Sequence, residues 1–377
     1  MPQAFADVAV LRKGDPQGNR MILRLTTHGG LTVHAIGVPQ DWPSRTGPTW
    51  AYLFESDGVT LIDPGAHGSF RELVEGIEQC GYSAKNIDRV IVSHGHSDHD
   101  GSVAEMVGTS GADLWTHGMY ATLLPYSQWE VQDRSSSPIH TEMNALADAA
   151  INHREESTYR RRNQRYNDSK KGLTVDHTVA DGETFGDATI IHAPGHSPDE
   201  LCVTLDGVVF TGDHVLPEIT PHPTTKATYR SHIQEIMPAE FADASKSYGL
   251  ETYMRSLKTV IDLGPTYSIL PAHRLYNRNR YNFQTVDRAR EVVLHHARRL
   301  NQILQRLTNE TSGLETVTRG IFEHGKLLGG NLYMALAEIV AHVELLEDLG
   351  DLEFTEDKQL RKTGSQNHRQ FVAELIG

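Results

Sequence analysis

The most constraining feature of this sequence is a cluster of histidines and aspartates at residues 94–99, His-Gly-His-Ser-Asp-His. It directly follows residues 89–93, a β-branched run that predicts a short buried strand. Side chains two apart in an extended segment point the same way, so His94 and His96 can hold one cation. Asp98 and His99 fall on the turn beyond and can reach a second. Because imidazole and carboxylate suit zinc, iron and related metals, the cluster predicts a metal site on a loop leaving a rigid strand.

Three further candidate ligands, His196, Asp213 and His273, each stand where another predicted strand ends in a loop. A glycine precedes His196 and Asp213, which lets the backbone approach closely, as crowded metal loops require. A single histidine is usually an ordinary surface or core residue. Seven ligand-type residues placed in this way are much harder to explain by structure alone. The histidines closest to the motifs, His67, His192 and His214, are interpreted as neighbours of the site and not as ligands.

The order of predicted elements indicates a mixed α/β fold. Strands are expected at 31–38, 50–55, 59–63, 89–93, 112–116, 187–192, 201–205, 208–211 and 267–270, with helices at 70–79 and 240–262. Between about 120 and 176 the composition turns polar, with a helical stretch near 141–150. We interpret this segment as an insertion, or lid, over the main fold.

The C-terminal part has a different pattern. Two helical stripes of apolar residues, at 286–307 and 332–346, are followed by a short strand at 352–356. We therefore expect a domain at 1–285 and a small winged-helix-like module at 286–377. That module has 11 Lys and Arg against 14 Asp and Glu, so we interpret it as a packing or dimerisation element, with a homodimer as one candidate assembly.

Composition narrows the class of protein. The chain has 377 residues and a net charge of −14, which repels nucleic acid and anionic membranes on average, so neither is an expected partner. Its two cysteines cannot form a cysteine-based zinc site and fit a reducing compartment. Since no secretory signal or long apolar stretch is visible, we expect a cytoplasmic protein.

Four motifs in this order resemble the hydrolytic branch of the metallo-β-lactamase superfamily: HxHxDH at 94–99, HAPGHS at 192–197, TGD at 211–213 and LPAH at 270–273. The resemblance implies an αββα sandwich with two divalent metal ions at one edge of two facing sheets. Zinc is the expected metal, with iron and manganese as alternatives. His94, His96 and His196 would then hold the first ion and Asp98, His99 and His273 the second. Asp213 would bridge the two, and Asp63, in the LIDPG stretch at 61–65, would lie beside the site.

The resemblance extends to one subgroup, the LACTB-like proteins and related thioesterases. The C-terminal part is similar to their winged-helix extension, and the stretch GLETYMRSL at 249–257 is similar to their helix before the last histidine. That subgroup usually has LPGHG where this chain has LPAHR, which puts Arg274 at the mouth of the site. With Tyr276 and Arg278, it forms a candidate substrate-binding group.

The implied activity is hydrolysis by a metal-bridging hydroxide, with Asp98 orienting the nucleophile and accepting its proton. Residues 153–171 hold seven Lys and Arg against three Asp and Glu, so an anionic small molecule such as a coenzyme A thioester, or another ester or lactone, is the expected substrate. The TGD motif argues against β-lactam hydrolysis. A metal-dependent endoribonuclease or phosphodiesterase is the main alternative. A mononuclear iron sulfur dioxygenase and a metal-bound scaffold without activity stay open.

Overall fold

The computed structural model describes residues 4–40, 44–133, 137–150, 153–307, 311–322, 327 and 330–377. It divides into two compact units. The first comprises Met1–Pro125, Arg165–Pro221 and Thr259–Ala289, and the second comprises Tyr126–Gln164, His222–Lys258 and Arg290–Gly377. Two internal segments of the predicted range 1–285 therefore group with the C-terminal residues. The predicted boundary at 285/286 lies a few residues from the last change of unit.

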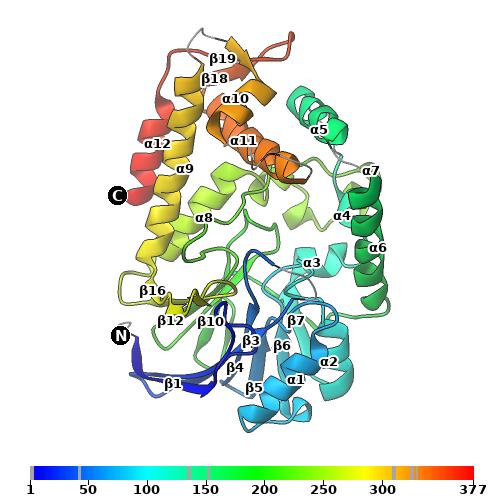
Figure 1. The fold of residues 1–377 in the computed structure, drawn as a ribbon, viewed down its shortest axis with the longest axis vertical. Helices are drawn as coiled ribbons and strands as arrows, with labels where there is room; N and C mark the ends of the chain where they lie inside the picture. Colours follow the sequence, from blue (N-terminus) through cyan, green and yellow to red (C-terminus); the bar gives the residue numbers. More distant parts are fainter. Residues whose placement is uncertain are drawn as a thin grey trace. The chain divides into compact units, whose positions relative to one another are not determined.

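Two large sheets form the core of the first unit (Figure 1). The larger sheet has eight strands in sequence order, antiparallel up to the fifth strand and parallel from there on. Its strands are β1 (Phe5–Arg12), β2 (Ile22–Thr27), β3 (Thr32–Val38), β4 (Thr49–Glu55), β5 (Val59–Ile62), β6 (Arg89–Ile91), β7 (Asp113–His117) and β8 (His177–Val179). The smaller sheet runs in the order β16 (Gln284–Thr285), β13 (Ser268–Pro271), β12 (Val208–Gly212), β11 (Leu201–Leu205), β10 (Ala188–His192) and β9 (Thr184–Phe185).

Alternation along the strands creates two apolar layers. One face of the larger sheet packs on the smaller sheet, where Phe54 stacks on Phe210 with ring centroids 5.0 Å apart. The opposite face, with residues such as Ile36 and Leu53, packs against α1 (Phe70–Gln79) and α2 (Val103–Ser110). The apolar side chains that point to these two faces of the larger sheet are nearly all buried. These two layers confirm the predicted α/β fold class, with a helix-covered sheet facing a second sheet.

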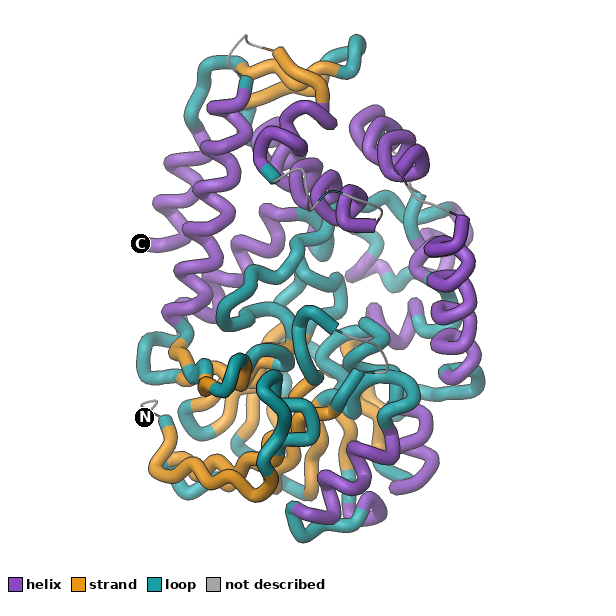
Figure 2. The backbone as a smooth tube through the Cα atoms, viewed as in Figure 1, coloured by secondary structure: helices purple, strands orange, loops and turns teal. Residues whose placement is uncertain are grey.

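Direct hydrogen bonds join the two sheets at one end. The N–H of Trp50 donates to the carbonyl of Ala272 at 2.7 Å, and the hydroxyl of Tyr52 donates to the carbonyl of Pro271 at 2.7 Å. The N–H of Leu201 donates to the carbonyl of Ser93 at 2.8 Å. Loops follow β6, β10, β12 and β13 at this end, and Figure 2 shows loop segments gathered above the strands of this unit. The strand ends are thus held together where the predicted ligands lie.

Most predicted elements of this unit are present within one or two residues, but the sequence did not predict all of its strands, and one predicted helix, which falls mostly in the second unit, is partly wrong. The strands β1 and β2 were not predicted. β1 is the edge strand of the sheet, and its buried and exposed residues alternate only weakly. The predicted helix over 240–262 is wrong in its first ten residues, because α8 begins at Leu250 and ends at Asp262. Short 3₁₀ turns occupy Ala239–Phe241 and Ala244–Lys246 instead. Gly249, with φ of 101°, turns the chain just before the helix.

The second unit is mostly helical. The segment 126–164 contributes α4 (Gln128–Val131), α5 (Pro138–Ala150) and the start of α6 (His153–Ser169). The C-terminal residues form α9 (Asp287–Arg306), α10 (Leu314–Ile321), α11 (Gly330–Asp348) and α12 (Asn367–Ile376), with a sheet of β17 (Thr311–Gly313), β19 (Gln359–Lys362) and β18 (Leu352–Phe354). Both apolar helical stripes are confirmed. The winged-helix interpretation stays a prediction. Among the described helices, none is both long and apolar enough to cross a membrane.

Candidate metal centre

The loop after β6 turns back on itself and carries four of the predicted ligands. The N–H of His96 donates to the carbonyl of His94, and the N–H of His99 donates to the carbonyl of His96. This winding presents ligands of neighbouring positions in different directions. His94 and His99 are fully buried, whereas Asp98 keeps 22% of its side chain exposed. The loop therefore offers ligands both deep in the site and at its surface.

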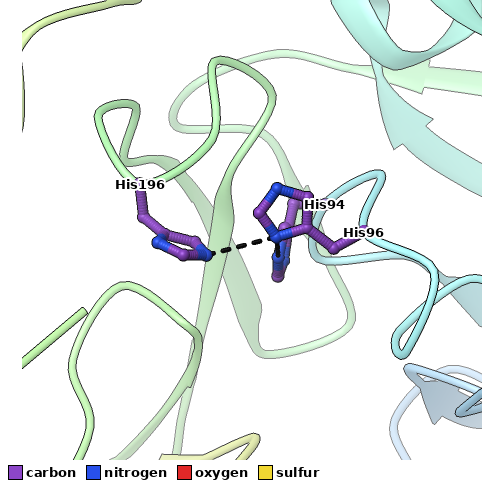
Figure 3. Close-up of side chains that lie close together, drawn as sticks. All are labelled: His94, His96 and His196. Atoms are coloured by element: carbon purple, nitrogen blue, oxygen red, sulfur yellow. Dashed lines mark hydrogen bonds between the residues drawn. The ribbon is translucent and has the colours of Figure 1, made fainter. Parts of the chain in front are cut away.

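Three imidazoles converge in the first candidate ligand group, His94, His96 and His196 (Figure 3). Nε2 of His94 lies 2.9 Å from Nδ1 of His96, and Nε2 of His196 lies 3.3 Å from that same Nδ1. His94 and His96 come from the loop after β6, whereas His196 comes from the loop between β10 and β11. Three nitrogens at this separation can hold a single cation.

Asp98, His99 and His273 form a second ligand group. Nε2 of His273 lies 3.2 Å from Oδ2 of Asp98, and Nε2 of His99 lies 4.0 Å from Oδ1 of the same carboxylate. Both histidines are fully buried. A carboxylate with two imidazoles is a common ligand set for zinc, manganese and non-haem iron.

The carboxylate of Asp213 lies between the two groups. Its Oδ2 is 3.6 Å from Nε2 of His196, and its Oδ1 is 3.6 Å from Nε2 of His99 and 3.5 Å from Nε2 of His273. The two oxygens thus face different groups. This arrangement can serve two cations at once, and the bridging role that the family resemblance implied for Asp213 stays a prediction.

The buried donor atoms fit a metal. Nε2 of His99, Nε2 of His273 and Oδ1 of Asp213 are buried, and none has a hydrogen-bond partner within the described chain. Leaving such atoms unpaired costs free energy unless another ligand satisfies them. All three lie together at the second group, where both Nε2 atoms are 3.5–3.6 Å from Oδ1 of Asp213. The donor set of imidazoles and carboxylates therefore fits divalent metal ions, zinc included.

A layer of hydrogen bonds orients the ligands from behind. Nδ1 of His99 lies 2.9 Å from Oδ2 of Asp63, and Nδ1 of His273 lies 2.8 Å from the carbonyl of Pro48. Nδ1 of His94 lies 3.0 Å from the hydroxyl of Ser93. Because these contacts occupy Nδ1, they leave Nε2 of each ring facing the centre. Asp63 was expected beside the site, and the structure places it there.

Glu200 adds a buried carboxylate that the sequence did not suggest. Its Oε1 accepts the N–H of Asp213 at 3.0 Å, and its Oε2 lies 3.4 Å from Nδ1 of His94. The fit is tight, because a Cβ at Gly212 would lie 2.3 Å from Oε1 and the φ of Gly212 is 49°. Burial, helped by the charge of Asp213, raises the pKa of Glu200 well above its usual value. Glu200 thus supports both the bridging aspartate and one histidine.

Charges inside the site favour ionised carboxylates. Burial opposes ionisation of Asp98 and Asp213, but the surrounding imidazoles outweigh it and lower the pKa of both. Burial lowers the pKa of His94 and His96. For His99, burial acts in the same direction, but Asp213, Asp63 and Asp98 together raise its pKa. A cation would take the place of the proton that these carboxylates attract to His99.

The three predicted substrate-binding residues are not among the converging atoms. Arg274 directly follows His273, and its guanidinium donates to the carbonyl of Arg45 and lies 3.7 Å from Oε2 of Glu218. The ring of Tyr276 packs on Tyr281 with centroids 5.1 Å apart. Arg278 is exposed on the turn between β14 (Tyr276–Asn277) and β15 (Arg280–Tyr281). Their role in substrate binding stays a prediction.

Comparisons with known proteins give a matching family model and similar folds. The sequence profile of the metallo-beta-lactamase superfamily matches residues 44–273. A metallo-beta-lactamase family protein from Thermus thermophilus has a similar structure, with a TM-score of 0.59 at 18% identity over 88% of this chain and 98% of that one. A beta-lactamase domain protein from Burkholderia ambifaria gives a TM-score of 0.63 at 20% identity over 90% of this chain and 95% of that one. At these identities, the two structures establish the fold alone.

A similar curated sequence is the uncharacterized protein YobT of Bacillus subtilis (strain 168), 25% identical over 175 residues. The match covers 44% of this chain and 61% of that protein.

Proposed function

Because this chain belongs to the metallo-beta-lactamase superfamily, we propose that it is a dinuclear metal-dependent hydrolase of ester-type bonds, with anionic thioesters as its substrates. The superfamily consists mostly of metal-dependent hydrolases. The number of metal ions and the substrate class are the parts that this proposal adds.

The position of Asp213 is the observation that carries the proposal. One of its oxygens faces His196, and the other faces His99 and His273, at 3.5–3.6 Å in each case. A site for a single ion has no use for a carboxylate turned toward two separate groups of imidazoles. The buried atoms without a hydrogen-bond partner in the described chain, Nε2 of His99, Nε2 of His273 and Oδ1 of Asp213, support a cation on the His99 and His273 side of this carboxylate.

The chain's own residues would divide the work as follows. His94, His96 and His196 would hold one ion and Asp98, His99 and His273 the other, with Asp213 shared between them. Bound divalent metal supplies a Lewis acid for the substrate oxygen and makes hydroxide available at neutral pH. The partly exposed carboxylate of Asp98 is ionised and can accept the proton released as the tetrahedral intermediate collapses. No serine or cysteine nucleophile is required.

Basic residues beside the site support an anionic substrate. The β14–β15 hairpin begins three residues after His273 and exposes Arg278 in its turn and Arg280 at the start of β15. Guanidinium groups bind carboxylate and phosphate through paired hydrogen bonds. A thioester of a phosphorylated carrier, such as coenzyme A, combines such charges with an acyl bond that hydroxide cleaves readily. The similarity to the LACTB-like and thioesterase subgroup noted in the sequence points the same way.

A substrate panel with metal analysis tests the proposal. The metal-loaded protein is assayed with an acyl-CoA thioester, a simple ester, a lactone and an RNA, and its metal content is measured. We expect about two equivalents of divalent metal and thioester hydrolysis that chelation abolishes and added metal restores. His96→Ala should lose activity and the metal equivalent held by the three-histidine group, while His28→Ala, which changes an exposed histidine, should keep activity and both equivalents.

Three outcomes would count against the proposal. RNA cleavage with salt-dependent binding would favour the phosphodiesterase alternative. One equivalent of iron with oxygen consumption would favour the sulfur dioxygenase. Full thioesterase activity in metal-free protein would refute the hydrolase mechanism itself.

A further inference from the structure

The peptide of Gly95, between two of the metal-binding histidines, is held on both sides by buried side chains. Its N–H donates to Oδ2 of Asp199 at 2.8 Å, and its carbonyl lies 3.2 Å from the hydroxyl of Tyr166. There is little free space around it, because a Cβ at Gly95 would lie 3.2 Å from the Tyr120 ring and 3.3 Å from Asp199. Rotation of either peptide bond plane next to Gly95 would swing His94 or His96 away from the other.

Tyr166 is itself fixed by a buried ion pair. Its hydroxyl lies 2.7 Å from Oδ1 of Asp100, and it accepts a hydrogen bond from Nζ of Lys170 at 2.7 Å. Nζ of Lys170 also lies 3.1 Å from Oδ2 of Asp100, whose side chain is fully buried. Tyr120 donates to the same Oδ2 at 2.9 Å. The single hydroxyl proton of Tyr166 is therefore shared between Asp100 and the Gly95 carbonyl.

Neither Tyr166 nor Lys170 contacts a predicted metal ligand directly. They act on the loop backbone, through Gly95 and through Asp100, which follows His99 in the sequence. Both come from the C-terminal end of the basic segment 153–171, for which the sequence suggested only a solvated lid or a substrate-binding surface. A structural tether alone would not need to meet the loop at the residue between His94 and His96.

We propose that Tyr166, Lys170 and Asp199 are positioning residues that clamp the Gly95 peptide and so set the geometry of the three-histidine group. The inference rests on the proposed dinuclear site. The clamp should strengthen the binding of one ion selectively, the ion held by His94, His96 and His196. The ion held by Asp98, His99 and His273 should be affected far less, because the rings of His99 and His273 are oriented by Asp63 and Pro48 and the Asp98 carboxylate contacts Gln40.

Metal affinity tests the clamp without any need for a substrate. Metal-free full-length protein is titrated with Co²⁺, and the visible absorption of each equivalent is followed against a competing chelator. In Tyr166→Phe, we expect affinity for one equivalent to fall about 10-fold or more, the usual effect of removing a residue that orients a ligand, while the other stays near the wild-type value. Lys170→Met should act in the same direction, and Lys170→Arg should restore part of the loss.

Tyr82→Phe provides the matched control. This change also removes one hydroxyl that is hydrogen-bonded to a carboxylate, that of Glu55, at 2.8 Å. Glu55 is the last residue of β4, whereas Thr49, which contacts the Asp98 carbonyl, is the first residue of the same strand. The control variant should bind both equivalents as the wild type does. Circular dichroism establishes that each metal-free variant is folded, and if Tyr166→Phe does not fold, Lys170→Met decides.

Wild-type affinity in the folded variants, or an equal loss at both equivalents, would overturn the clamp while leaving the proposed hydrolase intact. If the wild-type protein binds no cobalt or zinc, it is the proposed function that fails.

Discussion

Oδ2 of Asp63 lies 2.9 Å from Nδ1 of His99, and both side chains are buried. The same aspartate accepts the N–H of Ser93 on Oδ1 and the hydroxyl of Ser93 on Oδ2, both at 2.7 Å. It therefore fixes the tautomer of His99 and the start of the metal-binding loop together. Asp63 does this from a left-handed conformation, with φ of 55°, which aspartate and asparagine adopt more readily than most residues.

Asp63→Asn should weaken metal binding about 10- to 100-fold with little change in fold. An amide has one acceptor oxygen, so it cannot receive the three hydrogen bonds that the carboxylate receives. Chelator competition measures the affinity. Asp57→Asn is the control, because Asp57 also has a left-handed φ, of 50°, but lies exposed in a hairpin turn. Equal affinities in the two variants would contradict the role given to Asp63.

Asp98→Asn should lower kcat about 10²- to 10⁴-fold, the range expected for loss of a group that transfers a proton. The amide keeps the shape of the side chain and its contact with Gln40, whose Nε2 lies 3.1 Å from Oδ2. Steady-state kinetics is measured at saturating metal, so that weaker binding does not mimic the effect. A variant with wild-type kcat would show that Asp98 takes no part in the chemistry.

Metal should stabilise the folded protein. Two ligand groups draw on loops that follow β6, β10, β12 and β13, so a cation binds only when both sheets are in place. Free metal at 100 times its dissociation constant adds about 2.7 kcal/mol to the free energy of unfolding. Urea titration with and without Zn²⁺ measures the difference, which should be smaller in His96→Ala, because the three-histidine group loses a ligand while the other group keeps all of its ligands. Equal stabilisation of that variant would place the metal elsewhere.

Gly101→Ala should destabilise the protein by about 3 kcal/mol or more, because overpacking here meets backbone and not flexible side chains. A Cβ at Gly101 would lie 2.1 Å from the nitrogen of His67 and 2.4 Å from the carbonyl oxygen of Ser97. Gly108→Ala is the opposite case. Gly108 lies in α2 with open space around it, so alanine should stabilise by about 1 kcal/mol. Thermal unfolding compares the two, and a neutral Gly101→Ala would contradict the packing argument.

The buried His117 ring should lower the free energy of unfolding at acid pH. Burial, together with the nearby His192, lowers the pKa of His117 to about 3, against about 6.5 in an unfolded chain. Above pH 6.5, His117 is neutral in both the folded and the unfolded state, so it does not make the free energy of unfolding depend on pH. Below that pH, only the unfolded state takes the proton, so the free energy of unfolding falls by about 1.4 kcal/mol per pH unit until pH 3.

His117→Asn isolates this contribution. Asparagine keeps an acceptor for the N–H of Met119, which Nδ1 of His117 caps at 3.3 Å, but does not titrate. Between pH 7.5 and 5.0, the variant should lose about 2 kcal/mol less stability than the wild type in urea titrations. Identical losses would show that His117 is protonated in the folded protein.

The candidate ligands could be proposed from sequence because each stands at the end of a strand. The HxHxDH spacing after a buried strand, and single ligands after three others, suffice to propose one site in an α/β fold. Helix 70–79 and the two apolar stripes of the C-terminal part were equally visible, because their periodicity is local.

The supporting residues could not be predicted, because they act through contacts distant in sequence. Glu200 looks like any acidic residue in a loop until folding places its oxygens beside Asp213 and His94. Pro48 contributes only a carbonyl, which no side-chain pattern reveals. Tyr166 lies in a helix whose basic composition suggested contact with an anionic substrate. Gly249 was the one available signal that the helix over 240–262 starts late.

The hydrogen bonds from Trp50 to Ala272 and from Tyr52 to Pro271 join the two sheets that supply the metal ligands, so bound metal is a measure of correct folding. A strand that slips by one position presents its opposite side chains, so misaligned pairing in either sheet would turn at least one donor out of the centre. Retention of metal through gel filtration therefore counts the molecules in which the strands that lead into the ligand loops, β6, β10, β12 and β13, are correctly paired. Preparations of mutants can be graded by bound zinc before any substrate is known.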